Sequence, residues 1–497
     1  MDRRHFLQQT ALAGAAVLVG CRTDTSTPSP KARTAPVSVP GAPSYEVARE
    51  AAASAGPARR VRLVAEEIEV EVGPGEVWRT WGYNGEYPGP EIRLQEGQRL
   101  EATVVNRLPA DTTIHWHGIP VPNPMDGVPG LTQEPIPPGG EFVYAFAAEP
   151  AGSYLYHSHV GLQLDRGLIA PLIVEEREPH VAYDREVTLV LDDYLPGTPE
   201  PLADSPTGGG RGGMMGGRGM MGQGRRGGMM GGQVPPYAGL LINGRLPSDP
   251  VAVEVRRGER LRMRVMNPSG ATTFRFAVGG HRLTVTHADG YPVRPVTVDA
   301  LLVSMGERYD VVLEADNPGA WPIAAATVEG DSAPAQAVLR YRDAAAARPP
   351  AGALPDGLGN GRLLRLDDLR GVEDAPPPAR PDRTFDLTLS GGMMSSAWTI
   401  DGQAYPDAEP LEIREGERVR VTMFNRSPMI HPMHLHGHFF RTGDLRSGGV
   451  RKDTVLVPAH MGRAAFEFVA DNPGRWFFHC HNVYHLEAGM AREVRYV

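Results

Sequence analysis

The sequence predicts an all-β protein made of three β-sandwich units in tandem. Two observations suggest three units: one motif occurs three times with constant spacing, and a second motif follows each copy. A third observation is composition, because 59 Gly and 47 Pro among 497 residues suit short strands joined by turns. At about 150 residues per domain, the length also allows about three domains.

Each unit opens with a strand, a glycine turn and a second strand of alternating polarity, which ends at an asparagine. The three copies are Ile92–Leu100 before Asn106, Val253–Leu261 before Asn267, and Leu411–Val419 before Asn425. A later glycine and aromatic residue open another strand in each unit: Gly152-Ser153-Tyr154, Gly319-Ala320-Trp321 and Gly474-Arg475-Trp476. The predicted domains are therefore 60–178, 179–345 and 346–497.

The segment before these units reads as a signal followed by a tether. Arg3-Arg4 and the apolar run 11–20 resemble a twin-arginine export signal, and Leu18–Cys21 resembles a lipoprotein processing site. We therefore expect residues 1–21 to direct export to the periplasm or cell surface, with lipid attached to Cys21. A plain cleaved signal that removes Cys21 is the alternative. Residues 22–59 are rich in Ser, Thr, Pro and Ala and are predicted to be a disordered tether.

Charge and hydropathy exclude two classes of function. The net charge of −9 argues against a nucleic-acid partner. No uninterrupted apolar run reaches the roughly 18 residues that a membrane-spanning helix needs.

Histidines distinguish the first and third units from the middle one. At matching distances from the repeated asparagine or the later glycine, the first and third units carry four histidines each, whereas three of these positions in the middle unit hold Phe276, Val278 and Ala324. The eight are His115, His117, His157, His159, His434, His436, His479 and His481. Their repetition predicts one metal cluster between the first and third units, with the middle unit as a spacer.

A second site is predicted around Cys480. In a strand, Cys480 faces away from its neighbours His479 and His481, and His485 and Met490 follow closely enough to fold back toward it. Two His, one Cys and a weak axial Met form a blue-copper electron-transfer site. Its residues His431, Cys480, His485 and Met490 correspond to Thr112, Ser158, Gln163 and Leu168 in the first unit, so only the third can build it. A buried cysteine among core histidines is the alternative.

Together, His115-Trp116-His117-Gly118, His157-Ser158-His159, His431–Gly437 and His479–Met490 resemble the four copper motifs of three-domain multicopper oxidases. The resemblance covers about residues 60–497. It implies three cupredoxin-like domains and four copper ions. It also implies ligands: His431, Cys480, His485 and Met490 for type 1 copper, His115 and His434 for type 2, and His117, His157, His159, His436, His479 and His481 for the type 3 pair.

The resemblance implies an oxidase that takes single electrons at type 1 copper, through the edge of His431 or His485, and reduces dioxygen to water. Cys480 is catalytic in this account, because it joins type 1 copper to the cluster through His479 and His481. Asp126 matches the family's acid near type 2 copper, although an Asp-Gly turn explains it equally well. Leu486 stands where several bacterial members have a glutamate, and Glu487 follows it, so the second proton donor is open.

The insert 208–233 consists only of Gly, Met, Arg and Gln. Its methionine pairs are Met214 and Met215, Met220 and Met221, and Met229 and Met230. Thioether sulfur suits Cu(I), and Met-rich inserts occur in bacterial copper-resistance oxidases, so these residues and Met429 are candidates for Cu(I) capture. A low-complexity expansion without a role is the alternative. Ser427 departs from the acid that cuprous oxidases often place four residues before the type 1 histidine.

Three functions follow from these residues. The first is a monomeric cuprous oxidase of the copper-resistance protein A type, with dioxygen and Cu(I) as its partners. The second is a laccase-like oxidase of phenols or other small aromatic reductants. The third is a copper store without enzymatic activity, against which the complete ligand set argues.

Overall fold

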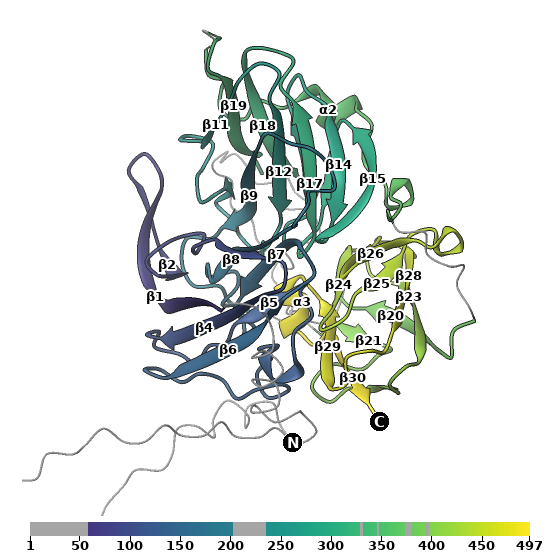
Figure 1. Ribbon diagram of the computed structural model, residues 1–497. Coiled ribbons are helices and arrows are strands. Elements are labelled where there is room, and N and C mark those ends of the chain that lie inside the picture. The colour runs from purple at the N-terminus through teal and green to yellow at the C-terminus, as the bar shows by residue number, and fades with distance from the viewer. Residues whose placement is uncertain (1–57, 202–234, 329–331, 345–346, 373–379, 393–396) are drawn as a thin grey trace, which may run out of the picture. The chain divides into compact units, whose positions relative to one another are not determined.

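A computed structural model describes residues 58–201, 235–328, 332–344, 347–372, 380–392 and 397–497. These residues form six β-sheets, two for each of the three repeats (Figure 1). Helix is confined to short segments: η2 (Asn123–Met125), α2 (Asp356–Asn360), η3 (Leu366–Asp368), η4 (Leu445–Ser447) and α3 (Val483–Glu487). Among the described residues, no helix combines the length and apolar character needed to cross a membrane. The all-β prediction is confirmed.

The first sandwich pairs a four-stranded sheet in the order β2-β1-β4-β6 with another in the order β3-β8-β7-β5. Its strands are β1 (Arg59–Gly73), β2 (Glu76–Tyr83), β3 (Ile92–Gln95), β4 (Gln98–Asn106), β5 (His115–His117), β6 (Glu141–Ala148), β7 (Gly152–His157) and β8 (Ile169–Glu175). Alternate residues of β4 are buried, and they pack in one core with Trp116 and Tyr156 from the facing sheet.

The second sandwich pairs a six-stranded sheet in the order β10-β9-β12-β17-β14-β15 with a five-stranded one in the order β11-β19-β18-β13-β16. Its strands are β9 (Arg185–Tyr194), β10 (Gly239–Ile242), β11 (Ala252–Val255), β12 (Arg260–Met266), β13 (Phe274–Val278), β14 (Leu283–Ala288), β15 (Tyr291–Val298), β16 (Leu301–Val303), β17 (Arg308–Glu314), β18 (Ala320–Thr327) and β19 (Ala335–Tyr341). Phe276 and Val278 are buried in its core, where the other units have histidines.

The third sandwich pairs the orders β21-β20-β23-β28-β25-β26 and β22-β30-β29-β24-β27. Its strands are β20 (Arg383–Ser390), β21 (Thr399–Ile400), β22 (Leu411–Ile413), β23 (Arg418–Asn425), β24 (His431–Leu435), β25 (Phe440–Thr442), β26 (Val450–Lys452), β27 (Thr454–Val457), β28 (Arg463–Val469), β29 (Arg475–Cys480) and β30 (Ala491–Tyr496). The domain boundaries at 178/179 and 345/346 stay predictions.

The repeated glycine has the same conformation in all three copies. Gly97, Gly258 and Gly416 have φ of 80°, 79° and 82°, a region that residues with a Cβ rarely adopt. Each lies between two strands that belong to different sheets of one sandwich. The turn therefore carries the chain from one layer to the other, which explains the constant spacing of the motif.

The repeated asparagine makes the same hydrogen bonds in each unit. Asn106, Asn267 and Asn425 are fully buried, and each side-chain amide donates to two backbone carbonyls. Each side-chain oxygen accepts the backbone N–H two residues further on. This corner satisfies buried backbone groups where the long strand ends. In the first and third units it leads into β5 and β24, which carry histidines.

Candidate metal centre

Strand pairing places the histidines of the first and third sandwiches in matching positions. In the first, β5 pairs with β7, so that His115 lies opposite His157. In the third, β24 pairs with β29, so that His434 lies opposite His479. Both sites are thus built on adjacent antiparallel strands, which hold side chains more rigidly than loops do.

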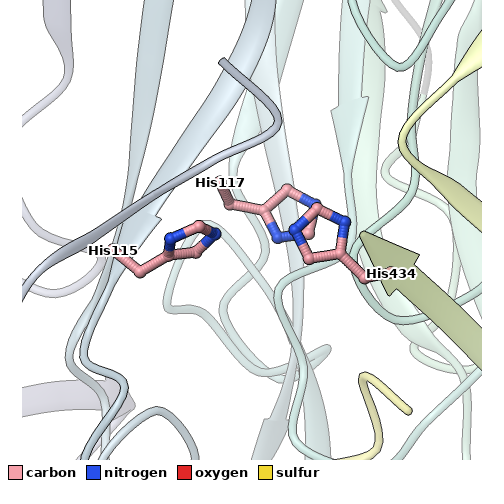
Figure 2. A group of neighbouring side chains, drawn as sticks. All are labelled: His115, His117 and His434. Atoms are coloured by element: carbon pink, nitrogen blue, oxygen red, sulfur yellow. The ribbon is translucent and has the colours of Figure 1, made fainter. Parts of the chain in front are cut away.

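The eight histidines form three buried groups of possible metal ligands that share the first and third sandwiches. Within each group one ligand atom of every residue lies within 4.8 Å of the others. The groups are His115, His117 and His434; His117, His157 and His481; and His159, His436 and His479. Figure 2 shows His115 and His117 with His434, whose ring stacks on that of His117 with 3.9 Å between ring centres.

Distances between imidazole nitrogens fit metal ligands. Nδ1 of His117 lies 3.2 Å from Nε2 of His481, and Nε2 of His436 lies 3.0 Å from Nε2 of His479. When two imidazoles bind the same ion, each at about 2.0 Å, their binding nitrogens lie about 3 Å apart. Nε2 of His115, His157 and His434 is buried without a hydrogen-bond partner. Buried polar atoms rarely stay unpaired, so this donor set fits metal ions.

Burial favours the neutral form of seven of these rings. Burial, together with the nearby His115 ring, lowers the pKa of His157 to about 3. Burial is likewise the largest influence on the lowered pKa values of His117, His159, His434, His436, His479 and His481. An imidazole must be deprotonated at the nitrogen that binds a metal. The environment therefore favours the protonation state that a ligand needs.

Two aspartates hold the far side of these rings in the same way. The carbonyl oxygen of Asp126 accepts from Nδ1 of His115 at 2.8 Å, and its carboxylate contacts Nδ1 of His436 at 3.0 Å. The carbonyl oxygen of Asp453 accepts from Nδ1 of His434 at 2.9 Å, and its carboxylate lies 3.3 Å from Nε2 of His117. Carboxylate and carbonyl partners of this kind orient metal-binding imidazoles.

The sequence points to Asp126 but not to Asp453. Asp126 is buried and its carboxylate lies beside two candidate ligands, His115 and His436. Asp453 is fully buried between β26 and β27, and a charged residue just before an apolar strand was the available signal. Burial opposes the ionisation of Asp453, but Arg308 and hydrogen bonds from His117 and His434 hold its pKa well below the usual range.

The candidate type 1 ligands meet on the opposite face of β29. Nδ1 of His431 and Nδ1 of His485 lie 3.2 Å apart, and each lies 3.6 Å from Sγ of Cys480. The N–H of Cys480 donates to the carbonyl of Met490 at 3.0 Å, which sets the buried Met490 beside it. His485 returns to this point because Asn482 caps helix α3, with its side chain accepting from two helix N–H groups.

The corresponding positions of the first sandwich also meet, but as hydrogen-bonded polar groups. Oε1 of Gln163 accepts from Thr112 at 2.8 Å and from Ser158 at 2.7 Å. The N–H of Ser158 donates to the carbonyl of Leu168 at 3.0 Å, as Cys480 does to Met490. The same backbone arrangement therefore carries soft metal ligands in one unit and a neutral hydrogen-bond cluster in the other.

Neither candidate type 1 imidazole reaches the surface, although the resemblance implies that electrons enter through the edge of one of them. His431 and His485 are both 0 % exposed. The Trp398 ring stacks on His485 with 3.9 Å between ring centres, and Nε2 of His431 is 2.7 Å from the hydroxyl of Ser427. The sequence gives no signal for Trp398, because this residue, just before β21, is far from the copper motifs in the chain.

The other candidates lie in different surroundings. The methionine pairs of the insert are outside the described residues, whereas Met429 is buried in the third core. Glu487 ends α3 and joins none of the ligand groups found among the described residues. The remaining histidines are also outside these groups: His180, His281, His287, His438 and His460. Four of them hydrogen-bond to protein groups such as the Tyr341 and Tyr496 hydroxyls, as expected for structural residues.

Comparisons with known proteins agree with this geometry. Three family models described as multicopper oxidase match residues 65–179, 186–344 and 377–497. The multicopper oxidase MmcO of Mycobacterium tuberculosis is 40% identical over 448 residues, covering 88% of this chain and 86% of its own. Copper resistance protein A of Escherichia coli is 31% identical over 536 residues, covering 83% of this chain and 88% of its own.

A solved structure shows the same fold. The laccase of Botrytis aclada superimposes with a TM-score of 0.72 and 26% identity, over 88% of each chain. Its similarity extends across all three sandwiches, which are cupredoxin-like, and the family implies copper as the cofactor. The chain is a copper-dependent oxidoreductase and belongs to the multicopper oxidase family.

Proposed function

We propose that the protein oxidises Cu(I) and couples this reaction to the four-electron reduction of dioxygen to water. Bound copper ions would supply the redox chemistry, accepting single electrons from the substrate and delivering them to dioxygen. The observation that carries the proposal is the double role of β29. Cys480 faces the group with His431 and His485, while His479 and its neighbour His481 join the histidine groups on the other side.

We assign four copper ions to these groups. His431, Cys480 and His485 would hold type 1 copper, with Met490 as the weak axial ligand. The type 2 ligands would be His115 and His434, which share one group with His117. The type 3 pair would be held by His117, His157 and His481 on one side and by His159, His436 and His479 on the other.

Asp126 is the residue that we propose to manage protons. Dioxygen reduction consumes protons, and the Asp126 carboxylate touches both His115 and His436. A single imidazole ring therefore separates the Asp126 carboxylate from each of two assigned copper positions. In this account Asp126 holds a proton near the site and releases it during turnover.

Cu(I) is favoured over a phenol for three reasons. Two similar proteins are named for copper resistance or as a multicopper oxidase. Both type 1 imidazoles are buried, with Trp398 stacked on one of them, so a bulky ring cannot touch their edges. In addition, Met461 is 61% exposed, and its N–H donates to Asn425 in the corner that precedes His431. The Met461 thioether is thus available at the surface, near the corner at Asn425 that precedes His431.

The insert 208–233 provides the test of substrate. Deleting it should lower the specificity constant for chelated Cu(I) by about tenfold or more and leave that for a phenol unchanged, because tethered thioethers raise the local Cu(I) concentration. A matched variant with all six paired methionines changed to leucine keeps the length of the insert and should behave like the deletion. Equal losses for both substrates, or none, would favour the laccase-like alternative.

We further propose export by the twin-arginine route to the periplasm or cell surface, with lipid on Cys21 and a monomeric chain. The support is the sequence of residues 1–21. Mass spectrometry of the mature protein and of Cys21→Ala tests it. A diacylglycerol adduct on the former alone is expected, whereas cleavage beyond Cys21 would exclude the anchor.

A further inference from the structure

Among the residues that the structure describes, the middle sandwich contributes none of the candidate type 1, 2 or 3 ligands, yet its backbone touches two of them. The turn between β16 and β17 passes through Gly306, which has φ of +84°. A Cβ on Gly306 would lie 2.8 Å from Cδ2 of His481 and 3.0 Å from Cε1 of His117. Only glycine allows this approach. The turn therefore forms part of the wall around the histidine groups.

Arg308 follows this turn and joins all three sandwiches. It is fully buried, and its Nη1 and Nη2 donate to the two oxygens of Asp453 at 2.8 and 2.7 Å. Its Nε donates to the carbonyl of Ser153 in the first sandwich at 3.0 Å. This paired arrangement fixes both the distance and the plane of a carboxylate, which a lysine ammonium cannot do.

The first copper motif leaves space for this ion pair. Gly118, the last residue of His115-Trp116-His117-Gly118, has φ of +86°. A Cβ there would overlap the Arg308 guanidinium and lie 2.7 Å from Oδ2 of Asp453. The glycine of the motif is therefore explained by a contact from the middle sandwich.

Asp453, which Arg308 holds in place, in turn contacts two candidate ligand rings. Its Oδ1 lies 3.3 Å from Nε2 of His117 and 3.4 Å from Nδ1 of His434. Asp126 makes the corresponding contacts on the other side, but no guanidinium forms an ion pair with it in the described parts of the chain. The arginine of the middle sandwich therefore distinguishes the surroundings of Asp453 from those of Asp126.

We propose that Arg308 is a positioning residue for the trinuclear copper site, acting through Asp453 on His117 and His434. The inference rests on the proposed ligand assignment. It adds a role for the middle sandwich, which supplies no ligand in that assignment. Residues that orient metal ligands typically change metal affinity or activity about 10- to 100-fold when they are mutated. A mispositioned His434 should weaken type 2 copper most, because that ion has only two protein ligands in the assignment.

The test is Arg308→Lys in the copper-loaded full chain, with Arg264→Lys as the matched control. Arg264 is 2% exposed and joins the same first and second sandwiches through Ser153, Asp310 and Glu186, but it does not contact Asp453. Copper per chain is measured during dialysis against a graded chelator, together with the blue absorbance and the electron paramagnetic resonance signal of non-blue Cu(II). Arg308→Lys should keep the blue absorbance and lose the non-blue signal at about 10- to 100-fold lower chelator concentration.

Two outcomes with the single variants overturn the inference. One is an Arg308→Lys protein that retains non-blue copper like the unaltered chain, and the other is equal loss from Arg264→Lys. If Arg308→Lys does not fold, Arg308→Met combined with Asp453→Asn leaves no unpaired buried charge and is measured in the same way. Retention of non-blue copper in that protein also overturns the inference. An unaltered chain without a non-blue signal would instead refute the proposed copper assignment.

Discussion

Two aspartates at corresponding positions have different surroundings, and this difference separates their roles. Arg308 fixes Asp453 as an anion, since it binds both carboxylate oxygens in a fully buried setting. Asp126 contacts His115 and His436 without such a partner among the described residues. A carboxylate without a fixed cation can exchange a proton more readily. We therefore expect Asp126, rather than Asp453, to serve proton transfer.

Asp126→Asn should leave the blue absorbance intact and slow steady-state turnover by about 100-fold, a typical loss for a proton-transfer group. The amide can still accept from an imidazole, so the ligand positions are preserved. Stopped-flow measurements without oxygen should show that substrate reduces type 1 copper at the same rate in the variant as in the unaltered protein. An unchanged turnover would show that Asp126 only shapes the turn.

Cys480→Ser should abolish the blue absorbance and all oxidase activity, because it removes a thiolate ligand and the covalent route to His479 and His481. The buried histidine groups remain, so three of the four assigned coppers should still bind. Metal analysis and absorption spectra of the same sample test both statements. A variant that stays blue would contradict the assignment.

At the scale of single residues, the sequence pointed to the candidate ligands but not to the residues that support them. Repeated spacing located all eight histidines, because the first and third units place them in or just after corresponding strands. Arg308, Asp453 and Trp398 belong to no repeated motif. Their importance arises from contacts between segments far apart in the chain, and local patterns cannot reveal such contacts.

At the scale of elements, helix α3 links the copper ligands to a buried acidic group. Tyr484 of α3 donates to Asp165, which also accepts from Tyr237 at 3.0 Å. Burial, together with the charge of Asp193, raises the pKa of Asp165 to about 7. The folded protein therefore binds a proton that the unfolded chain releases between about pH 4 and 7, and this contribution to stability is lost as pH rises through that range.

Asp165→Asn should remove the loss of stability that accompanies rising pH, since an amide does not ionise. The free energy of unfolding of the variant relative to the unaltered protein should rise by about 1–2 kcal/mol between pH 5 and 8. Urea unfolding at both pH values measures it. The exposed Asp184→Asn is the control: its pKa of about 2 leaves it ionised throughout, so no such change is expected. A pH-independent difference for Asp165→Asn would refute the account.

The elements themselves were largely predictable. Constant spacing from glycine to asparagine predicted the turn and the strand in each unit. In the structure the glycine is required by its positive φ, and the asparagine is held by hydrogen bonds from its side chain to the backbone. Helix α3 was not predicted, because five residues are too short for a helical hydrophobic period. Its signal was local, the asparagine cap at Asn482.

At the scale of the whole molecule, the middle sandwich is more than a spacer. Its strands follow the same pattern as the other two, but its histidine positions hold apolar core residues. Through Gly306 and Arg308 it also contacts the histidine groups shared by the first and third sandwiches. Three repeated units have thus diverged into one with the cysteine site, one sharing the histidine cluster, and one that supports it.

The ratio of substrate oxidised to dioxygen consumed tests the central claim most directly. Chelated Cu(I) is supplied to the copper-loaded protein, oxygen uptake and hydrogen peroxide are recorded, and the rate of Cys480→Ser is subtracted as background. Because dioxygen takes four electrons to form two waters and each Cu(I) gives one, we predict four Cu(I) oxidised per dioxygen and no peroxide. A ratio of two with stoichiometric peroxide, or uptake no faster than with Cys480→Ser, would contradict the account.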